Sequence, residues 1–130
     1  MADDPTAELL DLNRRLLESI AEADWKTYAE LCDATLSAFE PEARGHLVEG
    51  MDFHGFYFEL EKGASPCQTT IVSPKVRFLG DDVAVVTYIR LTQHLAADSE
   101  PKTSVFEETR VWQRQNGRWQ HVHFHRSDNR

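Results

Sequence analysis

Hydrophobic positions near the start of the chain recur at steps of three and four residues. Leu9, Leu12, Leu16, Leu17 and Ile20 form this stripe, and acidic residues stand early in the same segment. Such spacing places the apolar side chains on one face of a helix. The pattern therefore predicts a long amphipathic helix over 6–23.

The next segment is shorter and is interrupted by turn residues. Asp24 can cap a second helix that runs through Cys32, because its carboxylate can accept the free amides of the first turn. A short strand over 36–40 is expected to stop at Pro41. After a turn bracketed by glycines, a short helix is expected to begin near Met51.

From residue 67 onward the alternation of apolar and polar residues changes to period two. It predicts strands over 67–79, 82–95, 104–115 and 118–127. Helices followed by a meander of strands indicate an α+β domain. A curved antiparallel sheet wrapped around the long helix would form a cone whose apolar lining supplies both a core and a cavity.

The last hairpin decides which side chains share a face of this sheet. Its turn contains Asn116-Gly117, and a two-residue loop would set Arg110 opposite His123, whereas a three-residue loop would set it opposite Val122. We favour the three-residue loop over 115–117, with glycine in the left-handed position. It gathers the following residues on one face: Phe106, Arg110, Trp112, Val122, Phe124 and Arg126.

The same register assigns His121, His123 and His125 to the opposite face, with Glu107 opposite His125 and Thr109 opposite His123. Alternate residues on a strand lie roughly 7 Å apart, which is wide for one shared ion. No carboxylate or thiol is placed by the sequence to complete a metal shell. We therefore predict no metal site.

Composition narrows the class of protein. The 130 residues fit one domain over 1–130, and 14 Lys and Arg against 22 Asp and Glu give a formal net charge of -8. This charge disfavours nucleic acid and anionic membranes as partners. No apolar run approaches the roughly 20 residues that span a bilayer, and the acidic start is unlike a secretory signal, so we expect a cytoplasmic protein.

The usual motifs of cofactor binding and catalysis are missing from the sequence. Cys32 and Cys67 lie far apart with no CxxC spacing, which indicates reduced thiols and not a disulfide framework or a zinc site. The six glycines are scattered, and no phosphate loop, protein-kinase signature or nucleophile elbow is present. We predict no cofactor.

Three stretches carry a resemblance to a known family: SAFEPEARGHLVEGMDFHGFYFE (37–59), VTYIRLTQHL (86–95) and EETRVWQRQNGRWQHVHFHRS (107–127). The chain resembles the association, or hub, domain of calcium/calmodulin-dependent protein kinase II along its whole length. The resemblance implies the nuclear transport factor 2-like, or SnoaL-like, architecture. It also implies self-assembly into dimers and closed rings, with no catalysis of its own.

The resemblance further implies a pocket for a small carboxylate, lined by His54, Arg90, Arg110 and Arg126. Burying a guanidinium costs several kcal/mol unless it is neutralised, so three arginines together need either internal carboxylates or a ligand. The alternative left open by the residues is that the arginines pair with Glu108, Asp52 or Glu40, or project into solvent. Tyr57 and Tyr88 are expected to be packing residues at the cavity rim.

Two classes of function compete at this point. For self-assembly, the outer sheet face and the short helix would form contacts, with Trp119, Val111 and Val105 as candidates. For an enzyme of the ketosteroid-isomerase type, Asp52, His54 and Glu108 are the available acid–base groups, but a carboxylate beside arginines would be a weak base. The kinase domain and calmodulin-binding segment of the family are missing from the sequence, so the chain is either a piece of a kinase, with that kinase as partner, or free-standing.

Overall fold

The computed structural model describes residues 4–61, 67–95 and 100–128. The helical elements are α1 (Pro5–Ala21), α2 (Trp25–Leu31), the 3₁₀ turn η1 (Pro41–Ala43) and α3 (Asp52–Glu61). The strands are β1 (Cys32–Phe39), β2 (Val48–Glu49), β3 (Cys67–Phe78), β4 (Val83–Leu95), β5 (Pro101–Gln115) and β6 (Arg118–Asp128). These bounds confirm the predicted α+β class.

Two aspartates begin the first two helices. The Asp4 carboxylate accepts a hydrogen bond from Thr6 N at 3.0 Å, and the Asp24 carboxylate accepts one from Thr27 N at 3.2 Å. Both satisfy amides that have no partner within the helix. The predicted cap at Asp24 is thus confirmed, although the second helix ends at Leu31 and Cys32 already belongs to β1.

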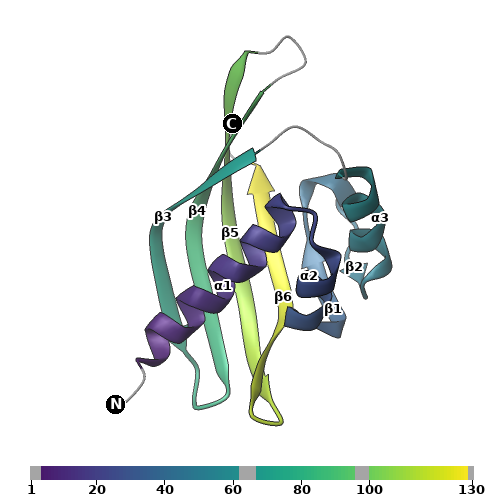
Figure 1. The fold of residues 1–130 in the computed structure, drawn as a ribbon. Helices are drawn as coiled ribbons and strands as arrows, with labels where there is room; N and C mark the ends of the chain where they lie inside the picture. The colour runs from purple at the N-terminus through teal and green to yellow at the C-terminus, as the bar shows by residue number, and fades with distance from the viewer. Residues whose placement is uncertain (1–3, 62–66, 96–99, 129–130) are drawn as a thin grey trace.

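All six strands form one sheet in the order β2-β1-β6-β5-β4-β3. Neighbouring strands are antiparallel, except that β1 runs parallel to β6. Figure 1 shows α1 lying diagonally across one face of this sheet, with α2 and α3 beside β1 and β2. Within the described residues, no helix combines the length and apolar character needed to cross a membrane.

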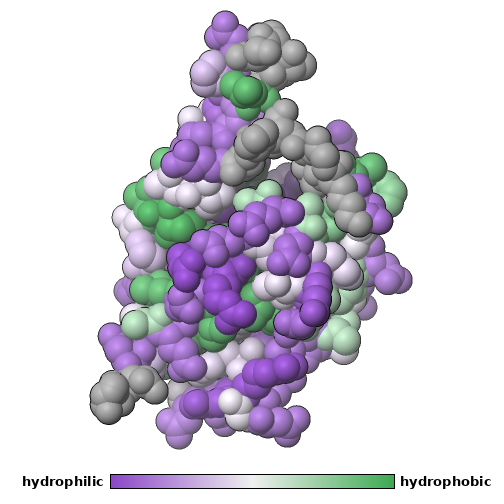
Figure 2. Space-filling model, viewed as in Figure 1, coloured by the Kyte–Doolittle hydropathy of each residue, from purple (hydrophilic) through white to green (hydrophobic). Residues whose placement is uncertain are grey.

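The core lies between α1 and the inner face of the sheet. Leu9, Leu16 and Leu17 are almost completely buried there, and each such side chain contributes about 1.5–3 kcal/mol when removed from water. Asn13 is buried among them and accepts a hydrogen bond from Trp112 Nε1 at 3.1 Å. The outer side of α1 carries charged residues, and the surface of this face is mainly hydrophilic (Figure 2).

The last hairpin differs from the predicted register. Gln115 pairs with Arg118, so the loop has two residues, and both Asn116 (φ 53°) and Gly117 (φ 78°) are left-handed. A β-bulge then leaves Val122 without a partner, and beyond it Arg110 pairs with Phe124. The predicted three-residue loop was wrong, and so was the pairing of Arg110 with Val122.

The bulge also explains which part of the face assignment holds. The loop is one residue shorter than predicted, which alone would move every β6 side chain to the opposite face. The bulge adds one residue to β6 and so returns the side chains beyond it to the predicted face. Phe106, Arg110, Phe124 and Arg126 therefore share the inner face, as predicted. Glu107 pairs with Ser127 and Thr109 with His125, so the two predicted histidine pairings were wrong.

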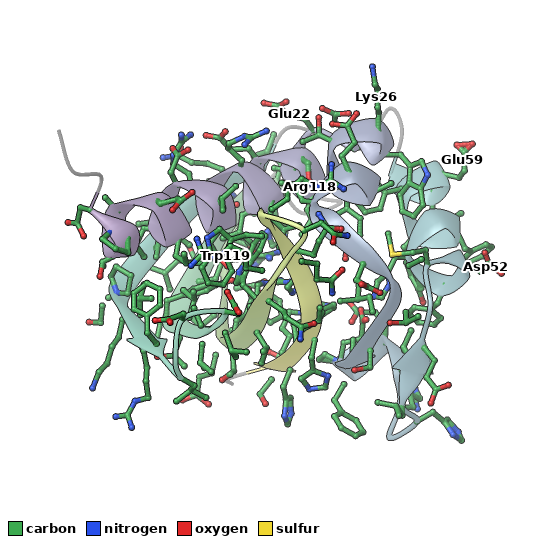
Figure 3. The ribbon with its side chains drawn as sticks, turned by 90° about the horizontal axis from the view of Figure 1, so that it is seen from below. Glu22, Lys26, Asp52, Glu59, Arg118 and Trp119 are labelled. Atoms are coloured by element: carbon green, nitrogen blue, oxygen red, sulfur yellow. The ribbon has the colours of Figure 1, made fainter. Side chains whose placement is uncertain are left out.

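Two residues of β6 lie on the side opposite to the one predicted for them. His121 pairs with Trp112 and is fully buried in the core, not on the outer face with His123. Trp119 is 5% exposed and packs in the core, as its direction beneath α1 in Figure 3 indicates, so it is not an outer contact residue. Both residues precede the bulge. In that part of β6, odd-numbered side chains point into the core, whereas beyond the bulge the even-numbered ones do.

Candidate functional site

Two guanidinium groups converge on one buried carboxylate at the inner face of the sheet. Arg90 Nη1 lies 3.0 Å from Glu108 Oε2, and Arg110 Nη2 lies 3.1 Å from Glu108 Oε1. Glu108 is 2% exposed and Arg110 is 1% exposed. The three residues meet because alternate positions on the neighbouring strands β4 and β5 point to the same face.

Tyr88 completes this group. Its hydroxyl donates to Glu108 Oε1 and accepts a hydrogen bond from Arg110 Nε at 2.8 Å. Burial alone would raise the pKa of Glu108, but Arg110 and Arg90 outweigh it and hold that pKa below its ordinary value. The carboxylate is therefore ionised and acts as the counter-ion of the two arginines.

A second set of ion pairs lies beside the first. Arg126 on β6 pairs with Glu42 on η1, and its Nη2 lies 3.6 Å from Glu40 Oε1. The other oxygen of Glu40 lies 2.8 Å from Nε2 of His54 on α3. The four candidate residues taken from the resemblance thus lie in one region of the interior, which we call the arginine cluster: Arg90, Arg110, Arg126, Glu108, Glu40, Glu42 and His54.

Aromatic rings support the guanidinium groups of this cluster. The Cζ atoms of Arg90 and Arg126 lie 5.8 and 5.0 Å from the centroid of the Phe106 ring. Arg110 lies 4.4 Å from the Phe124 ring centroid. Cation–π contacts of this kind are worth about 0.5–2 kcal/mol and hold the planar groups in fixed orientations.

Not every polar atom of the cluster is satisfied. Arg90 Nε, Arg126 Nε, His54 Nδ1 and Glu108 Oε2 are buried and have no hydrogen-bond partner within the described residues, although Glu108 Oε2 lies 3.0 Å from Arg90 Nη1 as an ion pair. An unsatisfied buried polar atom costs about 1–3 kcal/mol, so such atoms are unusual in a purely structural network. The Nε–H groups of Arg90 and Arg126 therefore retain capacity to donate hydrogen bonds to an additional acceptor.

His121 extends the cluster toward β1. Its Nε2 lies 3.4 Å from Arg110 Nη1, and its Nδ1 lies 3.4 Å from Cys32 Sγ. Burial first, and then the charge of Arg110, lower the pKa of His121 well below its ordinary value, so the ring is neutral. Burial likewise raises the pKa of the Cys32 thiol to about 12, which makes this free cysteine unreactive.

Three other residues considered in the sequence, Asp52, Tyr88 and Cys67, have different outcomes. Asp52 is exposed and points away from the body of the protein (Figure 3), so it does not belong to the arginine cluster. Tyr88 is buried inside the cluster and does not stand at its rim. The side chain of Cys67 lies outside the described part of the chain.

Over 4–61, 67–95 and 100–128, no three potential ligands are grouped to hold a metal ion.

Sequence reasoning missed Glu42 and His121. Glu42 stands in an irregular turn with no periodicity to orient it, and His121 was misassigned because the bulge was not expected. Glu108 could be found, because period-two alternation puts it on the face of Arg110.

The sequence and the fold of this chain both match known proteins. A family model described as the calcium/calmodulin dependent protein kinase II association domain matches residues 5–130. The chain belongs to this family. A relative from Oryctolagus cuniculus, calcium/calmodulin-dependent protein kinase type II subunit delta, is 52% identical over 122 residues, which are 92% of this chain and 23% of that protein. The chain thus spans about a quarter of the length of this curated relative.

Solved structures of the same family agree with this assignment. The hub homology domain of Chlamydomonas reinhardtii is 44% identical, with a TM-score of 0.91 over 98% of this chain and 100% of that one. The hub of S. rosetta is 39% identical, with a TM-score of 0.87 over 99% of this chain and 100% of that one. The resemblance drawn from the three sequence stretches is confirmed.

More distant structures bear on the fold alone. A nuclear transport factor 2-like protein from Salmonella enterica is 20% identical with a TM-score of 0.79, covering 95% of this chain and 90% of that one. A putative ketosteroid isomerase from Parabacteroides distasonis is 20% identical with a TM-score of 0.74, covering 98% of this chain and 90% of that one. They confirm the predicted nuclear transport factor 2-like architecture.

Proposed function

We propose that this chain is a self-association domain that forms dimers and closes them into rings. The observation that carries the proposal is a sheet with only one covered face. In the described part of the chain, α1 and α2 lie on one side of the sheet, and no helix covers the side chains on the other (Figures 1 and 3). A second copy would bury this face.

The uncovered face is apolar enough to drive association. Val85, Ile89 and Val111 are half-buried there, while Phe39 and Val72 are 41% and 37% exposed. A depression of about 500 Å³ lies on the same face, and its lining is mixed, with Ile89 beside the polar residues Thr87, Glu107, Thr109 and His125. Hydrophobic contacts at such a face are the usual core of stable homodimer interfaces.

The short helix α3 offers a second apolar surface. Phe56 and Leu60 are each 60% exposed on it, and Leu47 nearby in sequence is 46% exposed. Two separate apolar surfaces on one chain allow two kinds of contact. One would make the dimer and the other would join dimers into a closed ring.

Light scattering on the purified protein tests the proposal. We expect a mass that is an even multiple of the 14.9 kDa chain at micromolar concentration. Val111→Glu should release smaller species, because a charge on the uncovered face would be buried without a partner. Lys26→Glu, on the exposed outer side of α2, is the matched control and should leave the mass unchanged. A 14.9 kDa particle for the unaltered chain refutes self-association.

We also propose that the arginine cluster binds a small carboxylate. The buried Nε–H groups of Arg90 and Arg126, which have no partner within the described residues, support this proposal. Arginine suits a carboxylate because its planar fork donates two parallel hydrogen bonds. The lowered pKa of Glu108 makes it a poor base at neutral pH, which favours binding over proton abstraction and hence over an isomerase.

Thermal unfolding in the presence of acetate tests this second proposal. Acetate should raise the melting temperature of the unaltered protein at constant ionic strength. The increase should vanish in His54→Ala and Arg126→Gln and persist in Arg118→Gln, which changes an exposed arginine outside the cluster. Equal increases in all four proteins would indicate a general salt effect and would refute a specific site.

A further inference from the structure

Arg126 is paired with two carboxylates that differ in how firmly they are held. The Glu40 side chain is 7% exposed, and its second oxygen is already bonded to His54. The Glu42 side chain is 37% exposed and reaches the same Nη2 atom of Arg126 from the solvent side. Glu40 is therefore a fixed part of the interior, whereas Glu42 is an outer partner.

The segment that carries Glu42 is short and weakly capped. η1 is a single 3₁₀ turn whose N-cap residue, Glu40, makes no side-chain cap, and it is followed by Arg44, which has a left-handed backbone with φ 52°. Within the described residues, the Glu42 carboxylate has one partner, Arg126. Moving the Glu42 carboxylate into water therefore disturbs little besides its contact with Arg126.

The charge balance of the arginine cluster limits what else can bind. Three guanidinium groups, those of Arg90, Arg110 and Arg126, face three carboxylates, those of Glu40, Glu42 and Glu108. A fourth carboxylate added to this balanced set would carry an uncompensated charge into a buried region. Replacing one carboxylate by another keeps the balance, and Glu42 is the most exposed of the three.

We propose that Glu42 is a built-in competitor for the carboxylate site, occupying the edge of Arg126 that a bound carboxylate takes. Binding is then an exchange: the ligand pairs with Arg126 and the Glu42 side chain moves into water. This inference rests on the proposed carboxylate site. It adds that the affinity of that site is set partly by a residue of the protein that imitates the ligand.

A calorimetric or NMR titration with acetate at constant ionic strength tests the inference. Glu42→Gln removes the competing charge and leaves Arg126 in need of an anion, so it should bind acetate roughly three- to tenfold more tightly than the unaltered protein. Glu42→Asp keeps the charge on a shorter side chain and should fall between the two. Glu49→Gln, a neutralised exposed glutamate on β2, is the matched control and should leave the affinity unchanged.

The outcomes separate this inference from the proposal on which it rests. Equal acetate affinity in the unaltered protein and in Glu42→Gln overturns the role of Glu42 while leaving the carboxylate site in place. An absence of binding in both overturns the two together. Repeating the titration with a capped glutamate peptide distinguishes a free carboxylate from one carried by a polypeptide, and a gain for Glu42→Gln with either ligand supports the exchange.

Discussion

The Glu108 carboxylate lies between the guanidinium groups of Arg90 and Arg110 and is almost inaccessible to water. Glu108→Gln keeps the shape of the side chain but leaves two buried cations without their counter-ion. We expect the free energy of unfolding to fall by about 3–5 kcal/mol, because breaking a buried pair costs far more than forming it gains. Urea denaturation at fixed protein concentration measures the change.

Glu22→Gln provides the control for this measurement. Glu22 lies just after α1, is exposed and points away from the sheet (Figure 3). Neutralising it should change the free energy of unfolding by no more than about 0.5 kcal/mol. Equal effects of the two substitutions would show that Glu108 is not the counter-ion on which the arginines depend.

His121 makes stability depend on pH in a definite direction. Burial and Arg110 hold its pKa well below the ordinary value of 6.5, so below that pH the unfolded chain binds a proton that the folded protein does not. The free energy of unfolding is therefore unaffected by His121 above about pH 6.5 and falls as the pH drops below that value. The decline approaches about 1.4 kcal/mol per pH unit for one proton.

Unfolding free energies measured at about pH 7.5 and about pH 5.5 test this prediction. His121→Gln should flatten the decline, while His46→Gln, at an exposed position, should keep it. Glu108 also favours higher pH, but its ordinary pKa of 4.5 lies below this window. An unchanged slope in His121→Gln would assign the acid sensitivity to another group.

At the scale of elements, the β5–β6 hairpin depends on two left-handed residues. Gly117 has φ 78° and nothing within 4 Å of the place where a Cβ would stand, so Gly117→Ala introduces backbone strain without a clash. We expect a loss of about 1 kcal/mol in the free energy of unfolding. Denaturant unfolding of purified variants measures it.

Gly55 in α3 is the matched comparison for this substitution. Its backbone is helical, and an added Cβ would meet the Trp25 ring at 3.4 Å, an ordinary contact distance. Gly55→Ala should therefore stabilise the protein by up to about 1 kcal/mol, because alanine favours the helix. Destabilisation by Gly55→Ala and tolerance of Gly117→Ala would reverse the assignment of the two glycines.

The elements themselves follow from local signals in the sequence. The apolar spacing and the Asp24 cap located the first two helices, and period-two alternation located β3, β4, β5 and β6 to within a few residues. The start of β1 was missed, since Cys32 was assigned to the preceding helix. Where one element ends and another begins at adjacent residues, no turn residue marks the boundary.

At the scale of the whole molecule, the two faces of the sheet differ. One face of the sheet packs on α1 and contains the arginine cluster, while the other bears half-buried valines and no cover within the described residues. The two proposed activities therefore lie on opposite faces of the same strands. Adjacent residues such as Glu107 and Glu108 contribute to different surfaces, so single substitutions can test each face separately.

The sequence by itself determined the class of fold and the positions of most elements. These properties depend on periodicity and on caps, which are local. The shared face of Arg110 and Arg126 was predicted, but it depends on the β6 bulge, which the sequence did not reveal. The sequence also limited the choices for neutralising the arginines to internal carboxylates or a ligand, because a buried cation needs an anion wherever it lies.

Only the tertiary structure decided which carboxylate meets which arginine. The parallel pairing of β1 with β6 brings Glu40 and η1 toward Arg126, and the bulge at Val122 turns His121 into the core. Both depend on contacts between residues distant in the chain, whose register is set by the packing of the whole sheet and leaves no periodic trace in the sequence.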